Sequence, residues 1–464
     1  MATRISIALI LLTMLSACAY ALPAQAEPAP TPTAPPETEI PLIHVPALQV
    51  EDISAQAFPR MAIFWFGRVD TRNNYADTRI GYNQNNLSLY AAVFDHDLLH
   101  AESPAPSDLT RWDALAIYLQ PDNGAAGLEP GAYQFIVQAS PGYESFAWYQ
   151  TANIWNGKTW YPKKLNFSSQ SGWRGSAFDD GQPDMGWNAQ IDIPFTSLGI
   201  EAPAEGIQWR LGIELYDRDT REDPLRAPQV WPVHFSADNA ASWGRLQFGR
   251  AEQENQNIAF DQEIPLSSSQ DAAVGGGATC GENIDFWTAW GDRNGQANEN
   301  QQAYVNIQNQ RDIADWPCFS KAYFQLPLNQ IEPDKTVKAA YLRLYQFGNA
   351  GQTGSQMQPY RSFIQAFITG ADWSAGTITW NNAPQVKENI AITAVEPLDA
   401  FPGWPGQAIY WDITAAVQQA VQARTPLSVA LYSADGAYHS GKYFSSADAP
   451  DWNAAARPAL LILY

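Results

Sequence analysis

The sequence predicts an all-β protein built from two antiparallel β-sandwich domains of jelly-roll type. Short runs in which apolar and polar residues alternate recur along the chain, as they do in half-buried strands. Clusters of Gly, Pro, Asn and Asp separate these runs, as in the turns of sandwiches. An all-β domain often reaches about 200–250 residues. The 464 residues therefore accommodate two such domains.

The clearest predicted strands are short and rich in β-branched and aromatic residues. They are residues 87–94, 114–119, 133–137, 190–195 and 209–216, followed by residues 338–345, 428–432 and 460–464. One segment, residues 414–423, is predicted to be a helix. Thr414 is a suitable N-terminal cap, and Val417 and Val421 lie four residues apart on one face.

The composition excludes two classes of protein. The chain has 48 acidic and 27 basic residues, a formal net charge of −21. Nucleic-acid binding depends on Lys and Arg that neutralise phosphates, so this balance argues against a nucleic-acid partner. With 45% hydrophobic and only 16% charged residues, the chain is also too apolar to be largely disordered.

The N-terminus has the features of an export signal. Arg4 precedes an apolar run over residues 5–15, which is too short to span a bilayer as a helix. Residues 15–18, Leu-Ser-Ala-Cys, resemble a bacterial lipobox, which implies that residues 1–18 are removed and that Cys18 is lipidated. An ordinary signal cleaved after Ala26 fits as well. In both cases the protein is exported, either as a surface lipoprotein or in secreted form.

Composition also predicts the connecting segments. Residues 19–45 are rich in Pro, which favours an extended tether without a core. Residues 251–264 are rich in Glu, Gln and Asn and are predicted to link the domains. The two sandwiches are therefore predicted at residues 46–250 and 265–464.

Cys280 and Cys318 remain as an even pair after export. In an exported protein such a pair predicts a disulfide, which would stabilise the second domain. Two Cys without a nearby His do not form a zinc site.

The first domain resembles the family 9 carbohydrate-binding module and related DOMON-like sandwiches. The resemblance covers nearly the whole domain and is carried by residues 77–82, 87–97, 112–122, 191–199 and 242–248. It implies a sugar-binding sandwich, in some members with structural calcium.

The second domain is similar to carbohydrate-binding module family 96, also called the DNRLRE domain. The similar segments are residues 340–345, 373–384, 411–414, 444–448 and 457–464, of which Thr-Ile-Thr-Trp-Asn-Asn-Ala-Pro at 377–384 is the most specific. The family usually has Arg-Glu where this chain has Ser446-Ala447, so any role of that pair is in doubt here.

Three acidic residues are candidate calcium ligands. Asp95, Asp97 and Asp122 lie at the ends of predicted strands, where carboxylates chelate calcium together with backbone oxygens. Asp is also a common turn residue that bonds its own backbone, so both interpretations stay open. No other cofactor is required by the sequence.

Aromatic residues are candidate sugar contacts, because sugar rings have an apolar face that stacks on aromatic side chains. Asn156-Gly157 predicts a tight turn with Trp155 and Trp160 on its two sides. The other candidate residues of this platform are Asn153, Tyr161 and Trp231. Large aromatic residues also fill sandwich cores, so packing is the alternative for both tryptophans.

In the second domain, Arg361, His439 and Lys442 are the candidate polar contacts to a ligand. The acidic net charge repels an acidic polysaccharide unless a local basic patch offsets it. A neutral glycan is therefore favoured, although family 96 includes alginate binders.

Catalytic motifs are weak. The five His are scattered, and the chain has no His-Glu-x-x-His, Gly-x-Ser-x-Gly or phosphate-loop pattern. The predicted function is therefore non-catalytic binding of polysaccharide at the cell surface, with contact to the membrane only through a lipid on Cys18. A polysaccharide lyase or glycosidase, and a structural or adhesion protein of the envelope, remain the alternatives.

Overall fold

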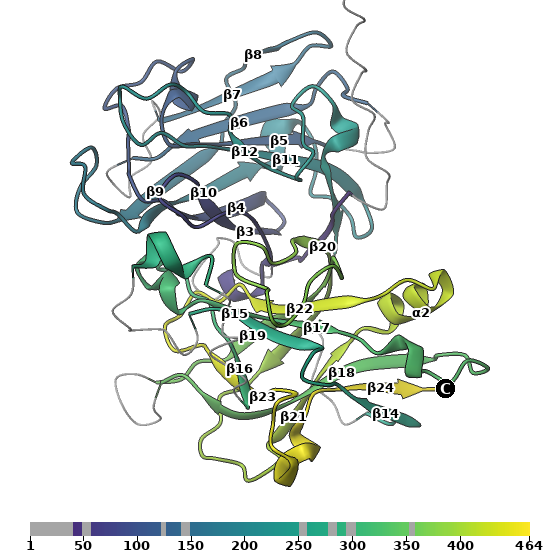
Figure 1. The fold of residues 1–464 in the computed structure, drawn as a ribbon. Helices are drawn as coiled ribbons and strands as arrows, with labels where there is room; N and C mark the ends of the chain where they lie inside the picture. The colour runs from purple at the N-terminus through teal and green to yellow at the C-terminus, as the bar shows by residue number, and fades with distance from the viewer. Residues whose placement is uncertain are drawn as a thin grey trace, which may run out of the picture. The chain divides into compact units, whose positions relative to one another are not determined.

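The computed structural model describes residues 40–464, apart from residues 49–56, 122–126, 141–148, 250–257, 277–284, 294–302 and 352–357. The described chain consists mainly of β-strands, with one α-helix, α2 (Thr414–Ala423), and several single-turn helices (Figure 1). The predicted all-β class is confirmed. Residues 35–464 form one compact unit. The described residues contain no helix that is long and apolar enough to cross a membrane.

The first sandwich is formed by two sheets of mostly antiparallel strands, which we name the inner and the outer sheet. The inner sheet has the order β2–β3–β4–β10–β9, and the outer sheet has the order β13–β11–β5–β6–β7–β8 with β12 beside β11. The inner strands are β2 (Ala62–Gly67), β3 (Tyr75–Tyr82), β4 (Asn86–Phe94), β9 (Ser168–Arg174) and β10 (Gly186–Pro194). The outer strands are β5 (Ala114–Gln120), β6 (Tyr133–Gln138), β7 (Gln150–Trp155), β8 (Trp160–Pro162), β11 (Gln208–Tyr216), β12 (Gln229–Trp231) and β13 (Gly244–Phe248).

The second sandwich also has two sheets, the facing sheet β15–β17–β22–β19–β20 and the far sheet β14–β24–β18–β23–β16 with β21 beside β18. The facing strands are β15 (Asp271–Gly275), β17 (Ser320–Gln325), β19 (Ser362–Thr369), β20 (Val386–Val395) and β22 (Ser428–Ser433). The far strands are β14 (Gln262–Pro265), β16 (Tyr304–Ile307), β18 (Ala339–Asn349), β21 (Gln407–Asp412), β23 (Lys442–Ser445) and β24 (Ala459–Leu463).

One short strand departs from the predicted antiparallel pattern. β1 (Leu42–Val45) pairs in parallel with β13, and Leu42 also pairs in parallel with Glu388 of β20. The outer and facing sheets thereby become one sheet of 13 strands. His44 Nε2 lies 2.8 Å from Glu388 Oε1 across this junction. β1 covers two strand edges that would otherwise carry unpaired backbone groups.

The helix lies where the sequence predicts it, but its start differs from the prediction. Thr414 is the first helical residue rather than the cap, and its backbone N–H donates to Asp412 Oδ1 at 2.9 Å. Its hydroxyl accepts a hydrogen bond from the backbone N–H of Ala340, because the neighbouring strand β18 offers that donor. Val417 is buried against the second sandwich, whereas Val421 is exposed.

Strands β2, β3 and β4 of the inner sheet are buried on both faces, whereas alternate residues of β9 are exposed. All residues of β3, and all but the first of β4, are buried. One face packs against the outer sheet, and the buried core continues from the other face to residues of the second sandwich such as Tyr323, Phe367 and Tyr432. A strand in such a position has no solvent side, so its polar residues need partners inside the protein.

Asp77 of β3 is the buried carboxylate at this contact. Its Oδ1 accepts a hydrogen bond from the Tyr75 hydroxyl at 2.7 Å. Its Oδ2 accepts from the Tyr432 hydroxyl at 2.7 Å and from Asn309 Nδ2 at 3.2 Å. Two of these three donors belong to the second sandwich.

Lys321 of β17 is the buried cation beside Asp77. Its Nζ donates to the Tyr75 hydroxyl at 2.6 Å, so one tyrosine joins the ammonium group to the carboxylate. The same Nζ lies 3.8 Å from the ring centroid of Trp380 and 4.1 Å from that of Trp65. Burial lowers the pKa of Lys321 well below its usual range, while Asp77 opposes this shift. Aromatic faces and one hydroxyl replace the water that a lysine normally keeps.

Arg79, two residues further along β3, makes the second polar contact between the sandwiches. Its Nε donates to the carbonyl oxygen of Ala434 at 3.0 Å, and its Nη2 donates to Asn309 Oδ1 at 3.0 Å. The guanidinium also lies 4.7 Å from the ring centroid of Phe58. Arg79 is thus held by hydrogen bonds and by an aromatic face, as a buried arginine requires.

The segment 377–384 also contributes to this contact. Trp380 is buried beside Lys321, and Asn381 exchanges two hydrogen bonds with Val69 of the first sandwich. The Val69 backbone N–H donates to Asn381 Oδ1 at 2.8 Å, and Asn381 Nδ2 donates to the Val69 carbonyl at 3.0 Å. The most family-specific string of the sequence therefore joins the two sandwiches in this protein.

Several predictions concern residues that the structure does not describe. The signal and tether lie at residues 1–45, of which only 40–45 are described, and Cys18 is outside them. Cys318 is buried, but Cys280 lies outside the described residues, so the disulfide stays a prediction. Half of the predicted linker, residues 251–257, is also not described, and the predicted domain boundaries stay predictions.

Replacing Asp77 by alanine is predicted to lower the free energy of unfolding by about 3–5 kcal/mol, because three donors lose their buried acceptor and Lys321 loses the nearby opposite charge. Chemical denaturation followed by tryptophan fluorescence measures this loss. The matched control is Asp108→Ala, since Asp108 is an exposed residue whose Oδ1 lies 4.0 Å from Arg111 Nη1. That change should cost at most about 1 kcal/mol. If both substitutions lowered the free energy of unfolding equally, Asp77 would not be the key buried acceptor between the sandwiches.

Candidate functional site

The predicted turn at Asn156-Gly157 is confirmed as a β-hairpin. β7 and β8 pair antiparallel, with Trp155 opposite Trp160. Asn156 Oδ1 accepts hydrogen bonds from the backbone N–H groups of Lys158 and Thr159, both at 2.9 Å. Gly157 has a φ of 95°, a left-handed conformation that glycine adopts without strain. The local sequence therefore sets the hairpin that carries both tryptophans.

The two indole rings lie on the solvent-facing side of the outer sheet. Their centroids are 5.4 Å apart, and the Trp160 ring lies 5.4 Å from that of Tyr118. Both rings are partly buried and pack against the small apolar cluster around Tyr118, Phe235 and Trp243. Packing therefore accounts for part of each ring, both residues remain partly exposed, and sugar contact stays a prediction.

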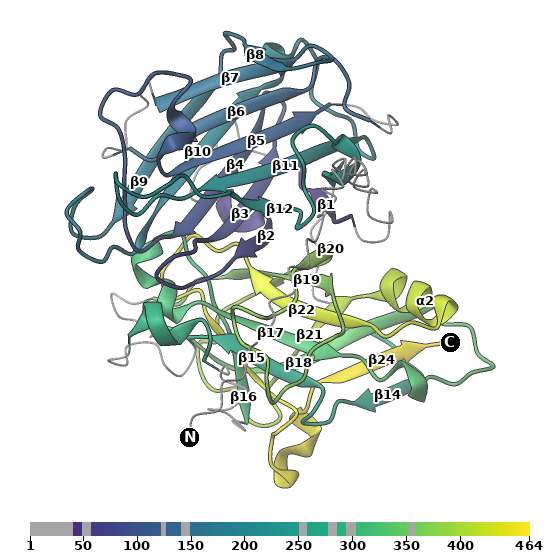
Figure 2. The same ribbon diagram turned by 45° about the horizontal axis from the view of Figure 1, so that its top comes forward.

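A row of polar side chains crosses the same face of the outer sheet. Asn153 Nδ2 donates to Gln134 Oε1 at 2.6 Å, and Gln134 Nε2 donates to the Tyr118 hydroxyl at 2.6 Å. The hydroxyls of Tyr118 and Tyr216 both donate to Glu214 Oε2 at 2.6 Å. Figure 2 shows the strands β7, β6, β5 and β11 that carry this row. Burial, together with the charge of Glu214, raises the pKa of Tyr118.

Strand alternation explains why these residues share one face. Leu115, Ile117 and Leu119 of β5 point into the core of the sandwich, whereas Ala116 and Tyr118 point outward. We name this outward side, with Trp155, Trp160, Asn153, Gln134 and Glu214, the hairpin face.

Two residues predicted for the aromatic platform do not lie on the hairpin face. Trp231 is only 1% exposed, and its ring packs 4.2 Å from that of Phe64 in the core, so the prediction of an exposed ring is wrong. Tyr161 is 40% exposed, but it follows Trp160 directly in β8 and points to the opposite side of the sheet.

The segments that carry the predicted polar patch of the second domain meet, since the backbone N–H of Tyr360 donates to the carbonyl oxygen of His439 at 3.1 Å, but Lys442 is not available to a ligand. Lys442 is fully buried, and its Nζ donates to the carbonyl oxygens of Tyr360 and Ser440. Burial lowers the pKa of Lys442 to about 8. Arg361 is exposed and forms an ion pair with Glu396. His439 is half-buried, with a positive φ of 61° in its loop. Lys442 is therefore a structural residue, which corrects the prediction of a ligand contact.

Asp95 is part of a cluster of three carboxylates in the first sandwich. One oxygen from each of Asp95, Asp113 and Asp217 lies within 4.8 Å of the others. Asp95 follows β4, Asp113 precedes β5, and Asp217 follows β11. Ala114 and Tyr216 are paired between β5 and β11, so their neighbours Asp113 and Asp217 reach the same sheet edge.

The cluster carries more negative charge than its surroundings neutralise. Asp95 is buried, and its Oδ2 has no hydrogen-bond partner among the described residues. Burial and the neighbouring carboxylates raise the pKa of Asp95 and of Asp113 well above their usual range. Burial raises the pKa of Asp217 to about 7, although Arg226 Nη1 donates to its Oδ2 at 2.9 Å. An oxygen-binding cation would relieve this arrangement, so the residues fit calcium.

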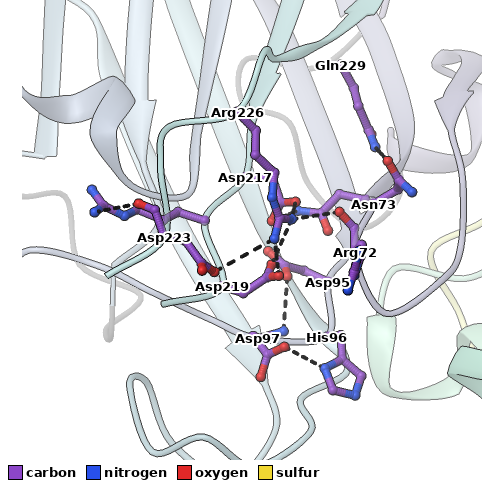
Figure 3. A network of polar contacts seen from close by, with 12 residues as sticks. Arg72, Asn73, Asp95, His96, Asp97, Asp217, Asp219, Asp223, Arg226 and Gln229 are labelled. Carbon is purple, nitrogen blue, oxygen red and sulfur yellow. Dashed lines mark hydrogen bonds and ion pairs between the residues drawn. The ribbon is translucent and has the colours of Figure 1, made fainter. Parts of the chain in front are cut away.

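Figure 3 shows the polar groups around Asp95 and Asp217. Arg226 also contacts Asp219, and Asn74 Nδ2 donates to Asp217 Oδ1 at 3.2 Å. Asp97 lies nearby but points to His96, whose Nδ1 is 2.7 Å from Asp97 Oδ2 (Figure 3). Of the three predicted ligands, Asp95 belongs to the cluster, Asp97 is not one of its three members, and Asp122 is outside the described residues.

Comparison with known proteins finds a family that is similar to the second sandwich. Residues 289–462 match the model of carbohydrate-binding module family 96, which confirms the resemblance found in the sequence. No curated protein matches the chain.

Solved structures similar to the chain cover about half of it. A protein from Bacteroides uniformis, described as carbohydrate-binding, is 11% identical with a TM-score of 0.34, and the match covers 45% of this chain and 99% of that one. A family 9 carbohydrate-binding module from Caldicellulosiruptor kristjanssonii in complex with cellotriose is 14% identical with a TM-score of 0.33, covering 47% and 100%. A family 9 module from the same organism in complex with glucose is 13% identical with a TM-score of 0.29. That match covers 46% of this chain and 97% of the other.

Proposed function

We propose that this protein is an exported, non-catalytic polysaccharide-binding protein anchored at the cell surface. The match of residues 289–462 to a carbohydrate-binding family is the observation that carries the proposal. The export signal and the lipobox-like Cys18 support the proposed location. In this account the Pro-rich segment holds the sandwiches away from the membrane, and the sandwiches hold polysaccharide near the cell.

The hairpin face is the proposed binding site of the first sandwich. The exposed sides of Trp155 and Trp160 offer apolar surface to the C–H face of a sugar ring. Asn153, Gln134 and Glu214 lie beside them and offer amide and carboxylate groups to hydroxyls. Because these polar groups already form hydrogen bonds with one another, they are held in place before a sugar arrives.

The proposed ligand of this face is a neutral glycan. Glu214 is the charged residue in the polar row, and it is an acceptor for two tyrosine hydroxyls. A uronate carboxylate would approach this negative charge within a protein of net charge −21. A neutral sugar avoids that repulsion and donates its hydroxyls to the carboxylate.

Calcium at the Asp95 cluster is the proposed structural cofactor of the first sandwich. Asp95, Asp113 and Asp217 would hold the ion through their carboxylate oxygens. The ion would supply positive charge at three strand ends that come from both sheets of the sandwich. Its proposed role is to stabilise this edge of the sandwich.

Trp160→Ala is predicted to weaken binding of a neutral glycan by about tenfold, since loss of one interface anchor costs about 1.4 kcal/mol or more. Affinity electrophoresis in gels that contain the glycan measures the change. Tyr161→Ala is the matched control, because Tyr161 neighbours Trp160 but points to the other side of the sheet, and it should leave affinity unchanged. A folded Trp160→Ala protein with the affinity of the wild type would exclude the hairpin face.

Asp95→Asn tests the calcium site through stability rather than sugar binding. Calcium at 100 times its dissociation constant should stabilise the wild type by about 2.7 kcal/mol, and EGTA should reverse this. In Asp95→Asn the calcium effect should fall sharply, while the metal-free protein becomes more stable because one buried like charge is removed. Asp108→Asn, at an exposed site, should respond to calcium like the wild type. If neither calcium nor EGTA changed the melting temperature of the wild type, the calcium site would be refuted.

A further inference from the structure

The second sandwich carries a cluster of exposed aromatic side chains. Trp452 is 69% exposed, Phe401 55% and Trp404 49%. Among the tryptophans that the structure describes, Trp404 and Trp452 are the two in the exposed class. Phe401 and Trp404 lie in the loop between β20 and β21, and Trp452 lies in the short helix before β24. We name these three residues the aromatic ledge.

The rings of the aromatic ledge support one another. Trp404 is central, with its ring centroid 5.5 Å from that of Trp452 and 5.1 Å from that of Phe401. Both pairs are edge-to-face, a favourable geometry for aromatic rings. Beneath them, Phe347 of β18 lies 5.7 Å from Trp404 and joins the ledge to the sheet. The ledge is therefore ordered by its own contacts before any ligand binds.

Exposed aromatic rings in contact with one another indicate an interaction surface. Isolated apolar residues at a surface are common, but a cluster of three large rings leaves contiguous apolar area in water without a gain in folding. The most exposed member, Trp452, is also the least needed for packing. Such a surface gains free energy only when a partner covers the rings.

The charged residues near the aromatic ledge indicate which kind of ligand it can bind. Asp399 and Asp451 are exposed close in sequence to Phe401 and Trp452. Arg457 is paired with Asp451 at 2.8 Å, and Arg361 is paired with Glu396 at the start of the Trp404 loop. Both arginines are thus engaged by carboxylates, and Asp399 leaves one net negative charge among these five residues. Uronate polymers and anionic lipid headgroups would be repelled, whereas an uncharged ligand is not.

We propose that the aromatic ledge is a second glycan-binding site, which stacks the pyranose rings of a neutral polysaccharide on Trp452, Trp404 and Phe401. This inference rests on the proposed function and assigns a site to the second sandwich. All three residues lie within the segment 289–462 that matches a carbohydrate-binding family. A row of rings suits a polymer that lies along the surface. The protein would then hold one polysaccharide at two separate places.

The test compares Trp452→Ala with Trp160→Ala and with the double variant. The probes are mixed-linkage β-glucan, xylan and galactomannan, and alginate is the acidic comparison. Binding of residues 27–464 to each probe is measured by affinity electrophoresis. Trp452→Ala should weaken binding of the retained neutral glycan about tenfold, and the double variant should bind more weakly than either single variant. Phe260→Ala removes an exposed aromatic residue outside the ledge and should change nothing.

The outcomes separate the ledge from the proposed function. Loss of binding in Trp160→Ala with unchanged binding in Trp452→Ala would overturn the ledge and keep the function. If no glycan slowed the migration of the wild-type protein in the gel, both the ledge and the proposed function would be overturned. A dimer that dissociates in Trp452→Ala, seen by sedimentation velocity, would identify the ledge as a contact between copies and overturn the glycan assignment. Because Trp452 is mostly exposed, the melting temperature should stay within a few degrees of the wild type in each case.

Discussion

The buried network in which Asp77 accepts from Tyr75, Tyr432 and Asn309, and Lys321 donates to Tyr75, is the constraint on which the fold depends. A strand such as β3 that is covered on both faces cannot leave a carboxylate or an ammonium group without partners, since the cost of burying an unpaired charge would exceed the stability of a typical domain. Here each charge is satisfied by residues from both sandwiches. The pairing therefore requires the second sandwich to lie on the inner sheet of the first.

This constraint determines which surfaces remain for ligands. In the first sandwich β2, β3 and β4 are covered on both faces, so strand surface reaches solvent on the hairpin face of the outer sheet and along β9. In the second sandwich the facing sheet is also covered, and the exposed rings occur in loops next to the far sheet. Trp380 and Asn381 illustrate the same effect, because the family-specific string that contains them is used for contact between sandwiches.

The sequence predicted the local structure well. The alternating strands, the helix at Thr414–Ala423 and the hairpin at Asn156-Gly157 follow from short-range patterns, and these patterns were sufficient. They do not show which strand faces are covered by distant parts of the chain. Trp231 is flanked by Pro228 and Pro232, which favours a place on the aromatic platform, although its ring packs on Phe64. Lys442 appeared free in a Gly-centred loop, but two carbonyl groups 2 and 82 residues away hold its ammonium group.

The sequence predicted only part of the candidate calcium site, because it does not show which distant residues come together. Asp95 stood out because it follows a strand, but Asp113 and Asp217 have equivalent positions at the ends of β5 and β11. Pairing of these strands in register would have brought the two residues together, yet register is a long-range property that the sequence does not display. The aromatic ledge was missed because Trp404 and Trp452 come from loops 48 residues apart, with no shared motif.

The most direct measurement of the central claim is a titration of the wild-type chain, without residues 1–26, with neutral and acidic oligosaccharides in an isothermal calorimeter, followed by analysis of the sugars. The account predicts heat of binding with a neutral oligosaccharide, weaker or absent binding with an oligouronate, and sugars that are recovered intact. Binding that is stronger to the oligouronate, cleavage of the sugar, or no binding to any oligosaccharide would contradict it.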